Sequence, residues 1–141
     1  MRLGTTYICV HDMDASLQFY TALLQRAPAY ANDDRWVTFD CGNFLSLYNR
    51  KYDEALLKKK DKIRFNDAYL NDFLQQDTEK KNNLIILNFE VENLLEEYDR
   101  VRALGIGAVS ELLYVNVHSP YWYFNVIDPD GNTVEITGKW T

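Results

Sequence analysis

Hydrophobic and polar residues alternate in short runs along much of the chain, a pattern typical of β-strands with one buried face. The first run, Thr5-Thr6-Tyr7-Ile8-Cys9-Val10-His11, is rich in β-branched and aromatic residues. The spacing then changes, and over about residues 13–25 apolar side chains recur every three or four positions. They are Met13, Leu17, Tyr20 and Leu24. The pattern therefore predicts a strand followed by an amphipathic helix.

Three further runs with strand character complete the first part of the chain. They cover residues 27–31, 36–41 and 43–49, and Cys41-Gly42-Asn43 supplies a tight turn between the last two. Residues 1–49 thus have the predicted order β-α-β-β-β.

The same order returns after residue 83. A strand is predicted over residues 84–91, and Asn93 with Glu96 forms a capping box for the helix that follows. Gly105 is a typical helix end. The buried stripe of this helix is Leu94, Tyr98 and Val101. Strands are then predicted near residues 108–115, 121–127 and 132–137.

Two anchors align the halves as an internal repeat. Val10 precedes the first helix as Val91 precedes the second, and residues 42–47 correspond to residues 131–136. An internal repeat determines architecture, because each copy forms one supersecondary unit. We therefore predict an α+β protein in which tandem βαβββ repeats, at 1–49 and 83–141, form a partly closed mixed β-barrel with the helices outside, as one domain.

Residues 50–82 match neither copy. This stretch holds nine of the 15 basic residues of the chain, so we interpret it as a solvated charged connector. Residues 67–74 could form a short helix with its apolar side chains facing inward. Those side chains are Leu70, Phe73 and Leu74. The short helix could cover a cleft, or it could only cover core surface.

Composition narrows the class of protein. A length of 141 residues with 47% apolar content allows one sizeable core, and the net charge of -6 argues against a nucleic-acid partner. No apolar run is long enough to cross a membrane. Cys9 and Cys41 lack the spacing of a zinc site, so we expect two buried thiols in a reducing cytoplasm.

The segment Asp128-Pro129-Asp130-Gly131-Asn132 predicts a tight turn into the last strand. In that strand Val134 and Ile136 point one way, so Glu135 points the other. A carboxylate on the inner face of a curved sheet either binds a ligand or needs a hydrogen-bonding partner.

The chain resembles the vicinal oxygen chelate superfamily, which includes glyoxalase I, bleomycin-resistance proteins, fosfomycin-resistance enzymes and extradiol dioxygenases. Residues 10–20 and 128–136 carry the resemblance, and the duplicated order of elements supports it. It implies the fold predicted above and a homodimer. It does not define a reaction, because one fold hosts many chemistries.

Enzymes of this superfamily usually hold one divalent metal in the cleft, on four inward-facing side chains. The resemblance maps these positions onto Thr5, Ser46, Ile86 and Glu135. Only Glu135 is a strong ligand, whereas a divalent ion needs three or four such donors or six or more oxygens. We therefore expect no metal and no other cofactor, and metal-dependent glyoxalase activity is disfavoured.

Strand alternation predicts which side chains line the cleft. The expected ligand-binding residues are aromatic or polar: Tyr7, His11, Phe44, Ser46, Tyr48, Asn88, Glu90, Tyr123 and Glu135. Such a lining is typical of a small-molecule pocket, and tyrosine rings with carboxylates favour a planar, cationic ligand. The alternative is that the aromatic rings fill the barrel themselves.

Three functions follow from this pattern. The first is a protein of the bleomycin-resistance type that binds a small planar organic molecule without metal. The second is a lyase- or dioxygenase-type enzyme of the same superfamily with an atypical site, in which Glu135 acts as general base. The third is a dimeric interaction module without a ligand.

Overall fold

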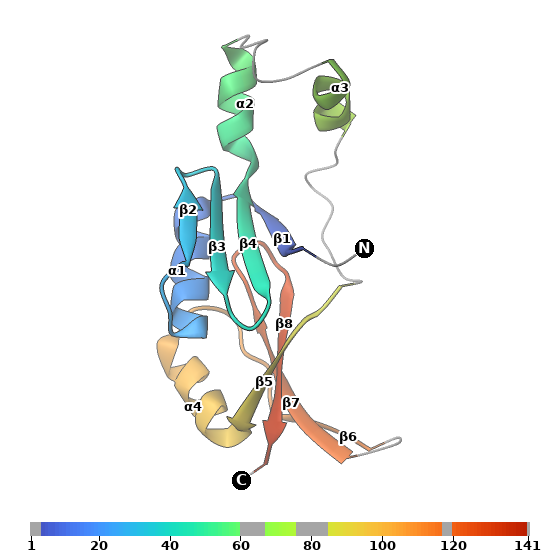
Figure 1. Ribbon diagram of the computed structural model, residues 1–141. Helices are drawn as coiled ribbons and strands as arrows, with labels where there is room; N and C mark the ends of the chain where they lie inside the picture. The colour runs from blue at the N-terminus through green and yellow to red at the C-terminus, as the bar shows by residue number, and fades with distance from the viewer. Residues whose placement is uncertain (1–3, 60–66, 76–84, 117–119, 141) are drawn as a thin grey trace. The chain divides into compact units, whose positions relative to one another are not determined.

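The computed structural model describes residues 4–59, 67–75, 85–116 and 120–140 (Figure 1). Its elements are β1 (Thr6–Val10), α1 (Met13–Leu24), β2 (Tyr30–Asn32), β3 (Trp36–Asp40), β4 (Phe44–Asn49), α2 (Arg50–Lys58), α3 (Asp67–Gln75), β5 (Leu87–Asn93), α4 (Leu94–Leu104), β6 (Leu113–Asn116), β7 (Pro120–Ile127) and β8 (Thr133–Lys139). The chain divides into two compact units. The first comprises Met1–Met13 with Pro28–Lys81, and the second comprises Asp14–Ala27 with Asn82–Thr141.

Each unit contains one four-stranded mixed sheet. The first has the strand order β1-β4-β3-β2 and the second the order β5-β8-β7-β6. In both sheets the first strand pairs in parallel with the last, and the remaining pairs are antiparallel. The predicted α+β class and the tandem βαβββ order are confirmed.

The strand register confirms how the two repeats align. Tyr7 lies opposite Ser46 in the first sheet, and Asn88 lies opposite Glu135 in the second. The parallel pairing also extends to the anchors, because Val10 faces Asn49 and Val91 faces Gly138. Position 138 requires a glycine, because a Cβ there would lie 2.5 Å from the Val91 carbonyl oxygen.

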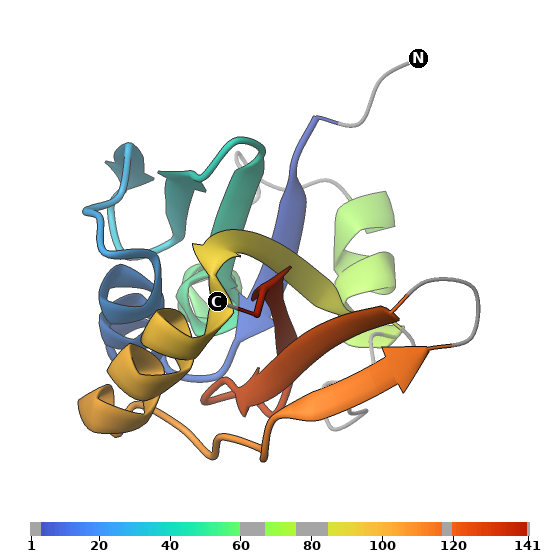
Figure 2. The same cartoon turned by 90° about the horizontal axis from the view of Figure 1, so that it is seen from below.

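Helix α1 belongs to the second unit, although it precedes three strands of the first. The Tyr20 hydroxyl donates to Asp128 at 2.8 Å, and the Ser16 hydroxyl donates to Asp130 at 2.9 Å. Figure 2 shows α1 next to α4, where the Arg100 guanidinium donates to the carbonyl oxygens of the last turn of α1, at residues 22 and 23. A cation at this end of a helix also complements the helix dipole.

The predicted turn at residues 128–132 is confirmed in detail. Asp128 is almost fully buried and accepts hydrogen bonds from the backbone N–H groups of Asp130 and Asn132 and from the Asn132 amide. Gly131 adopts φ 82°, a backbone conformation that favours glycine. The turn therefore fixes the start of β8 and, through Tyr20, the position of α1.

The core of the second unit lies between α4 and the apolar face of its sheet. Its fully buried side chains include Leu94, Val101, Phe124, Val126, Val134 and Ile136. The Tyr98 ring packs edge-on against Phe124 at 5.1 Å. The caps of α4 are as predicted: Asn93 accepts from the N–H of Glu96, and Gly105 is left-handed.

The structure corrects several sequence predictions. Residues 50–58 form helix α2, which the sequence did not predict. The possible helix at residues 67–74 forms as α3, but its Leu74 is 77% exposed rather than inward. In α1 the buried face runs through Ser16, Phe19 and Leu23 more than through Leu17 and Leu24.

The cysteines also differ from expectation. Cys9 is exposed and Cys41 is half-buried, so the expectation of two buried thiols is wrong.

Candidate functional site

Alternate residues of β1, β3 and β4 share one face of the first sheet, which we call the aromatic face. It carries Tyr7, Cys9, Trp36, Thr38, Phe44, Ser46 and Tyr48. The opposite face of the sheet is apolar and buried, through Val37, Phe39, Leu45 and Leu47. This separation of faces follows directly from the alternation in the sequence.

A chain of hydroxyl groups crosses the aromatic face beneath its rings. Ser46 Oγ lies 3.1 Å from Thr5 Oγ1 and 2.8 Å from Thr38 Oγ1. The Trp36 indole N–H donates to Thr38 at 2.9 Å. Thr38 and Ser46 are fully buried, so this chain satisfies polar groups that would otherwise be costly.

Three aromatic rings lie over this chain. The Tyr7 ring is 5.2 Å from Trp36 and 6.3 Å from Tyr48, and Trp36 is 6.1 Å from Tyr48. All three pairs are tilted or edge-to-face, the arrangements that aromatic rings prefer. Tyr7 remains 55% exposed, so the cluster presents ring surface instead of closing on itself.

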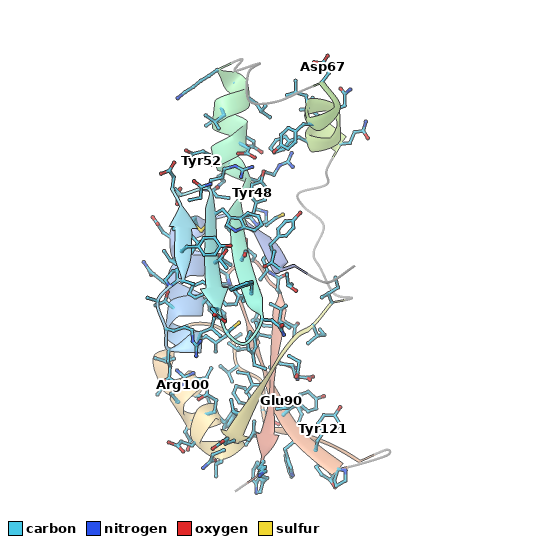
Figure 3. All side chains as sticks on the ribbon, in the orientation of Figure 1. Tyr48, Tyr52, Asp67, Glu90, Arg100 and Tyr121 are labelled. Carbon is cyan, nitrogen blue, oxygen red and sulfur yellow. The ribbon has the colours of Figure 1, made fainter. Side chains whose placement is uncertain are left out.

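Asp53 of α2 fixes one edge of the aromatic face. Its carboxylate is fully buried and accepts from the Arg35 guanidinium at 2.6 and 2.8 Å. The hydroxyls of Tyr48 and Tyr69 donate to the same carboxylate at 2.7 and 2.6 Å. Figure 3 shows Tyr48 near the junction of β4 and α2.

The electrostatics of this cluster follow from its hydrogen bonds. Burial alone would raise the pKa of the Asp53 carboxyl, but the bonds from the guanidinium and the two phenols outweigh burial and hold it below its usual range. Burial, the neighbouring Tyr69 and the Asp53 charge raise the pKa of Tyr48 far above its usual range. The cluster therefore stays charged at Asp53 and neutral at the phenols near neutral pH.

Tyr69 and Phe73 connect helix α3 to other residues of the first unit. Tyr69 reaches Asp53, and Phe73 is buried with the Arg50 guanidinium 3.6 Å from its ring centre. Arg50 also donates to the Phe73 carbonyl oxygen at 2.6 Å. Both contacts hold α3 to residues at or just after the end of β4.

The second sheet has a corresponding polar face, which we call the carboxamide face. It carries Asn88, Glu90, Tyr121, Tyr123, Asn125, Glu135 and Thr137. Asn88, Glu135 and Asn125 form one row across three strands, and the Asn88 amide donates to Glu135 at 2.9 Å. The Asn125 side-chain oxygen is buried and accepts no hydrogen bond from the described part of the chain.

The next row of the carboxamide face adds charge and ring surface. Glu90 lies opposite Thr137, which lies opposite Tyr123. The Tyr123 ring is 5.6 Å from that of Tyr121. Glu90 and Tyr121 are both exposed, and Figure 3 labels them on the second sheet.

Each sequence-predicted site residue can now be placed. In the first unit Tyr7, Phe44, Ser46 and Tyr48 lie on the aromatic face, and His11 is exposed just beyond β1. In the second unit all four candidates lie on the carboxamide face: Asn88, Glu90, Tyr123 and Glu135. The role of these nine residues in ligand binding stays a prediction.

Sequence reasoning missed several residues. Trp36 and Thr38 could have been found, because alternation places them on the same face as Ser46. Asp53 and Tyr69 had no comparable signal, since they come from helices in the segment interpreted as a connector.

Two general features of the described residues bear on function. They contain no group of three or more His, Cys, Asp or Glu side chains placed to hold a metal ion. None of their helices combines the length and apolarity required to span a membrane.

The model of the Glyoxalase/Bleomycin resistance protein/Dioxygenase superfamily matches residues 2–136. No curated protein matches the chain.

Several solved structures share the fold. A glyoxalase-related enzyme from Fulvimarina pelagi is similar with a TM-score of 0.66 and 18% identity, over 98% of this chain and 88% of that one. Lactoylglutathione lyase from Agrobacterium tumefaciens gives a TM-score of 0.62 and 18% identity, over 97% and 92%. A glyoxalase/bleomycin resistance protein from Catenulispora acidiphila gives 0.58 and 13%, over 96% of both chains.

Proposed function

Because the chain belongs to the glyoxalase/bleomycin resistance protein/dioxygenase superfamily, we propose that it binds a small planar organic molecule without a metal. The observation that carries the proposal is the aromatic face. There, three tilted rings with exposed surface stand over a hydroxyl chain whose bonds are already satisfied. Ring surface with few available polar groups suits stacking on a flat molecule.

The positions that the resemblance assigns to metal ligands support the same proposal. Thr5 and Ser46 offer neutral hydroxyls that are bonded to each other, and Ile86 has no donor atom. The fourth position, Glu135, already accepts from Asn88. This set does not fit the nitrogen, thiolate or carboxylate donors that a divalent ion requires.

The remaining features of the proposal follow from the family resemblance and the composition. We place the protein in the cytoplasm, where its two cysteines would remain reduced, and expect a homodimer. The proposed ligand contacts are given for each unit by itself. In the first unit they are Tyr7, His11, Trp36, Phe44, Ser46 and Tyr48, and in the second they are Asn88, Glu90, Tyr123 and Glu135.

The proposal is tested by titrating a neutral flat probe, indole, into the protein and following binding by calorimetry and thermal shift. A ligand that binds only the folded state raises Tm. We expect Tyr7→Ala to weaken indole binding about five- to tenfold, because an aromatic pair contributes about 0.5–1.5 kcal/mol beyond the area it buries.

Tyr114→Ala is the matched control, since Tyr114 is 50% exposed and belongs to the other unit. Equal indole affinity in the wild type and Tyr7→Ala would contradict the proposal, as would the absence of any binding at millimolar indole.

A further inference from the structure

The duplication allows the two polar rows to be compared position by position. By strand register, Ser46 of the first unit corresponds to Glu135 of the second, and Thr38, which faces Ser46, corresponds to Asn125, which faces Glu135. The same pairing relates Tyr7 to Asn88. Each row runs straight across three strands of its own sheet.

The first row satisfies its own hydrogen bonds. Ser46 is bonded to both Thr5 and Thr38, and Thr38 also accepts from the indole of Trp36. These groups need no donor from outside the protein.

The second row does not satisfy all of its hydrogen bonds within the described residues. Asn88 donates to one oxygen of Glu135, but the buried Asn125 oxygen accepts no hydrogen bond within the described residues. A buried acceptor without a donor is destabilising and rare in folded proteins. The Glu135 carboxylate and the buried Asn125 oxygen therefore lie in one row on adjacent strands, where a molecule that entered the row could supply donors to both.

The surroundings of this row define the chemistry of that donor. Glu90 adds a second carboxylate one row away, and the rings of Tyr121 and Tyr123 lie on the same face. Acceptors with negative charge select N–H donors with positive charge, and the rings offer surface to a flat body.

We propose that the carboxamide face binds a flat organic cation with paired N–H donors, such as an amidinium, a guanidinium or a protonated amino-heterocycle. Glu135 and Asn125 receive the N–H groups, and Asn88 holds the Glu135 carboxylate in place. This inference rests on the proposed function and adds the class of ligand and the residue Asn125.

The test uses two probes with the same ring. Benzamidine carries a cationic amidinium with parallel N–H groups, and acetophenone carries a planar neutral substituent without N–H. Both are titrated into the full chain by calorimetry. We expect benzamidine to bind at least tenfold more tightly than acetophenone, because hydrogen bonds to charged groups are about twice as strong as neutral ones.

Three variants locate the binding. Glu135→Gln keeps the shape of the side chain and removes its charge, and Asn125→Thr installs the residue that the first unit has at the equivalent position. We expect benzamidine to bind about ten- to a hundredfold more weakly to Glu135→Gln, and also more weakly to Asn125→Thr. Glu111→Gln, at an exposed position of the same unit outside the carboxamide face, is the control and should change the affinity less than threefold.

The outcomes separate this inference from the function on which it rests. If benzamidine and acetophenone bind equally well, or if benzamidine binds Glu135→Gln and Asn125→Thr as it binds the wild type, the N–H donor site is overturned while binding of flat molecules stands. If neither probe binds at millimolar concentration and indole also fails, both proposals are overturned. Circular dichroism and Tm of each variant verify that a loss of binding is not a loss of fold.

Discussion

At the scale of single residues, Asp53 and Asp128 are the carboxylates that the described part of the chain buries, and each is stabilised by several hydrogen-bond donors. Asp128 is held by backbone N–H groups and the Tyr20 hydroxyl, and Asp53 by a guanidinium and two phenols. A buried carboxylate is tolerated only when several donors replace its lost water. The oxygens of both carboxylates are already occupied by these donors, so both carboxylates serve to position other side chains.

Asp53 makes the stability of the protein sensitive to acid. Its pKa is lower in the folded chain than in the unfolded chain, so its contribution is present above the unfolded value of about 4. That contribution is lost as the pH falls through the lower folded value. We expect the free energy of unfolding of the wild type to fall below pH 4 more steeply than that of Asp53→Asn, as measured by urea denaturation between pH 2.5 and 7.

Asp40→Asn is the control for this measurement, because Asp40 is an exposed carboxyl at the end of β3 in the same unit. Parallel pH profiles for the wild type and Asp53→Asn would show that the Asp53 cluster is not held as described.

Sequence alone could place part of this residue-level detail. Alternation put Tyr7 beside Ser46 and Asn88 beside Glu135 on shared faces, and the register confirms both. It could not pair Asp53 with Arg35, since these residues lie 18 positions apart and no local pattern joins them. Side-chain partners across a loop depend on tertiary packing, which periodicity does not encode.

At the scale of elements, helix α3 of the inserted segment is connected to α2 through the side chains of Tyr69 and Phe73. Tyr69 and Phe73 attach α3, and both rings lie on one side of the helix, stacked at 5.9 Å. A short helix attached through side chains should open at a lower free energy than the hydrogen-bonded sheet beside it.

We therefore expect Tyr69→Phe to increase amide hydrogen exchange in α3 by about five- to tenfold, with little change in β3 and β4. The variant removes the hydroxyl that donates to Asp53, a bond to a charged group worth about 1.5–3 kcal/mol at most. Tyr52→Phe is the control, because the Tyr52 hydroxyl donates to the exposed Asp33 at 3.2 Å. Unchanged exchange in α3 would rule out the Tyr69 bond as its attachment.

Helices and turns were predicted correctly where capping residues and apolar spacing were regular. They were missed where charged residues interrupted the apolar spacing. Helix α4 has both of its predicted caps, and the turn at residues 128–132 forms as its residues require. Helix α2 was missed because residues 50–58 mix charges with only a few apolar side chains. Its stability depends on Asp53, whose burial the sequence does not reveal.

At the scale of the whole molecule, the repeat determined the architecture. Two copies of one order of elements gave two mixed sheets with the same strand order, as the aligned valines and glycines predicted. The fold does not determine the function of the protein, which depends on a few side chains on the polar faces of the two sheets.

The proposal makes a prediction for the whole protein about metals. Protein purified without chelator should contain well under 0.1 equivalent of nickel, zinc, manganese or iron by elemental analysis, and none of these ions should raise Tm specifically. The reason is the donor set: two bonded hydroxyls, an isoleucine and one carboxylate. One equivalent of any of these metals, lost on Glu135→Gln, would contradict it.

Helix α1 lies in the first sequence repeat but packs in the second compact unit, so the repeats and the compact units have different boundaries. A fragment that stopped at residue 49 would contain one whole copy of the repeat. It would nevertheless leave Tyr20 without Asp128, and Phe19 without Gly107, whose missing Cβ makes room for that ring. Cutting the chain after the first repeat would thus separate α1 from the residues it packs against. The first fragment would expose the buried side of α1, and the second would lack the helix that covers this part of its core.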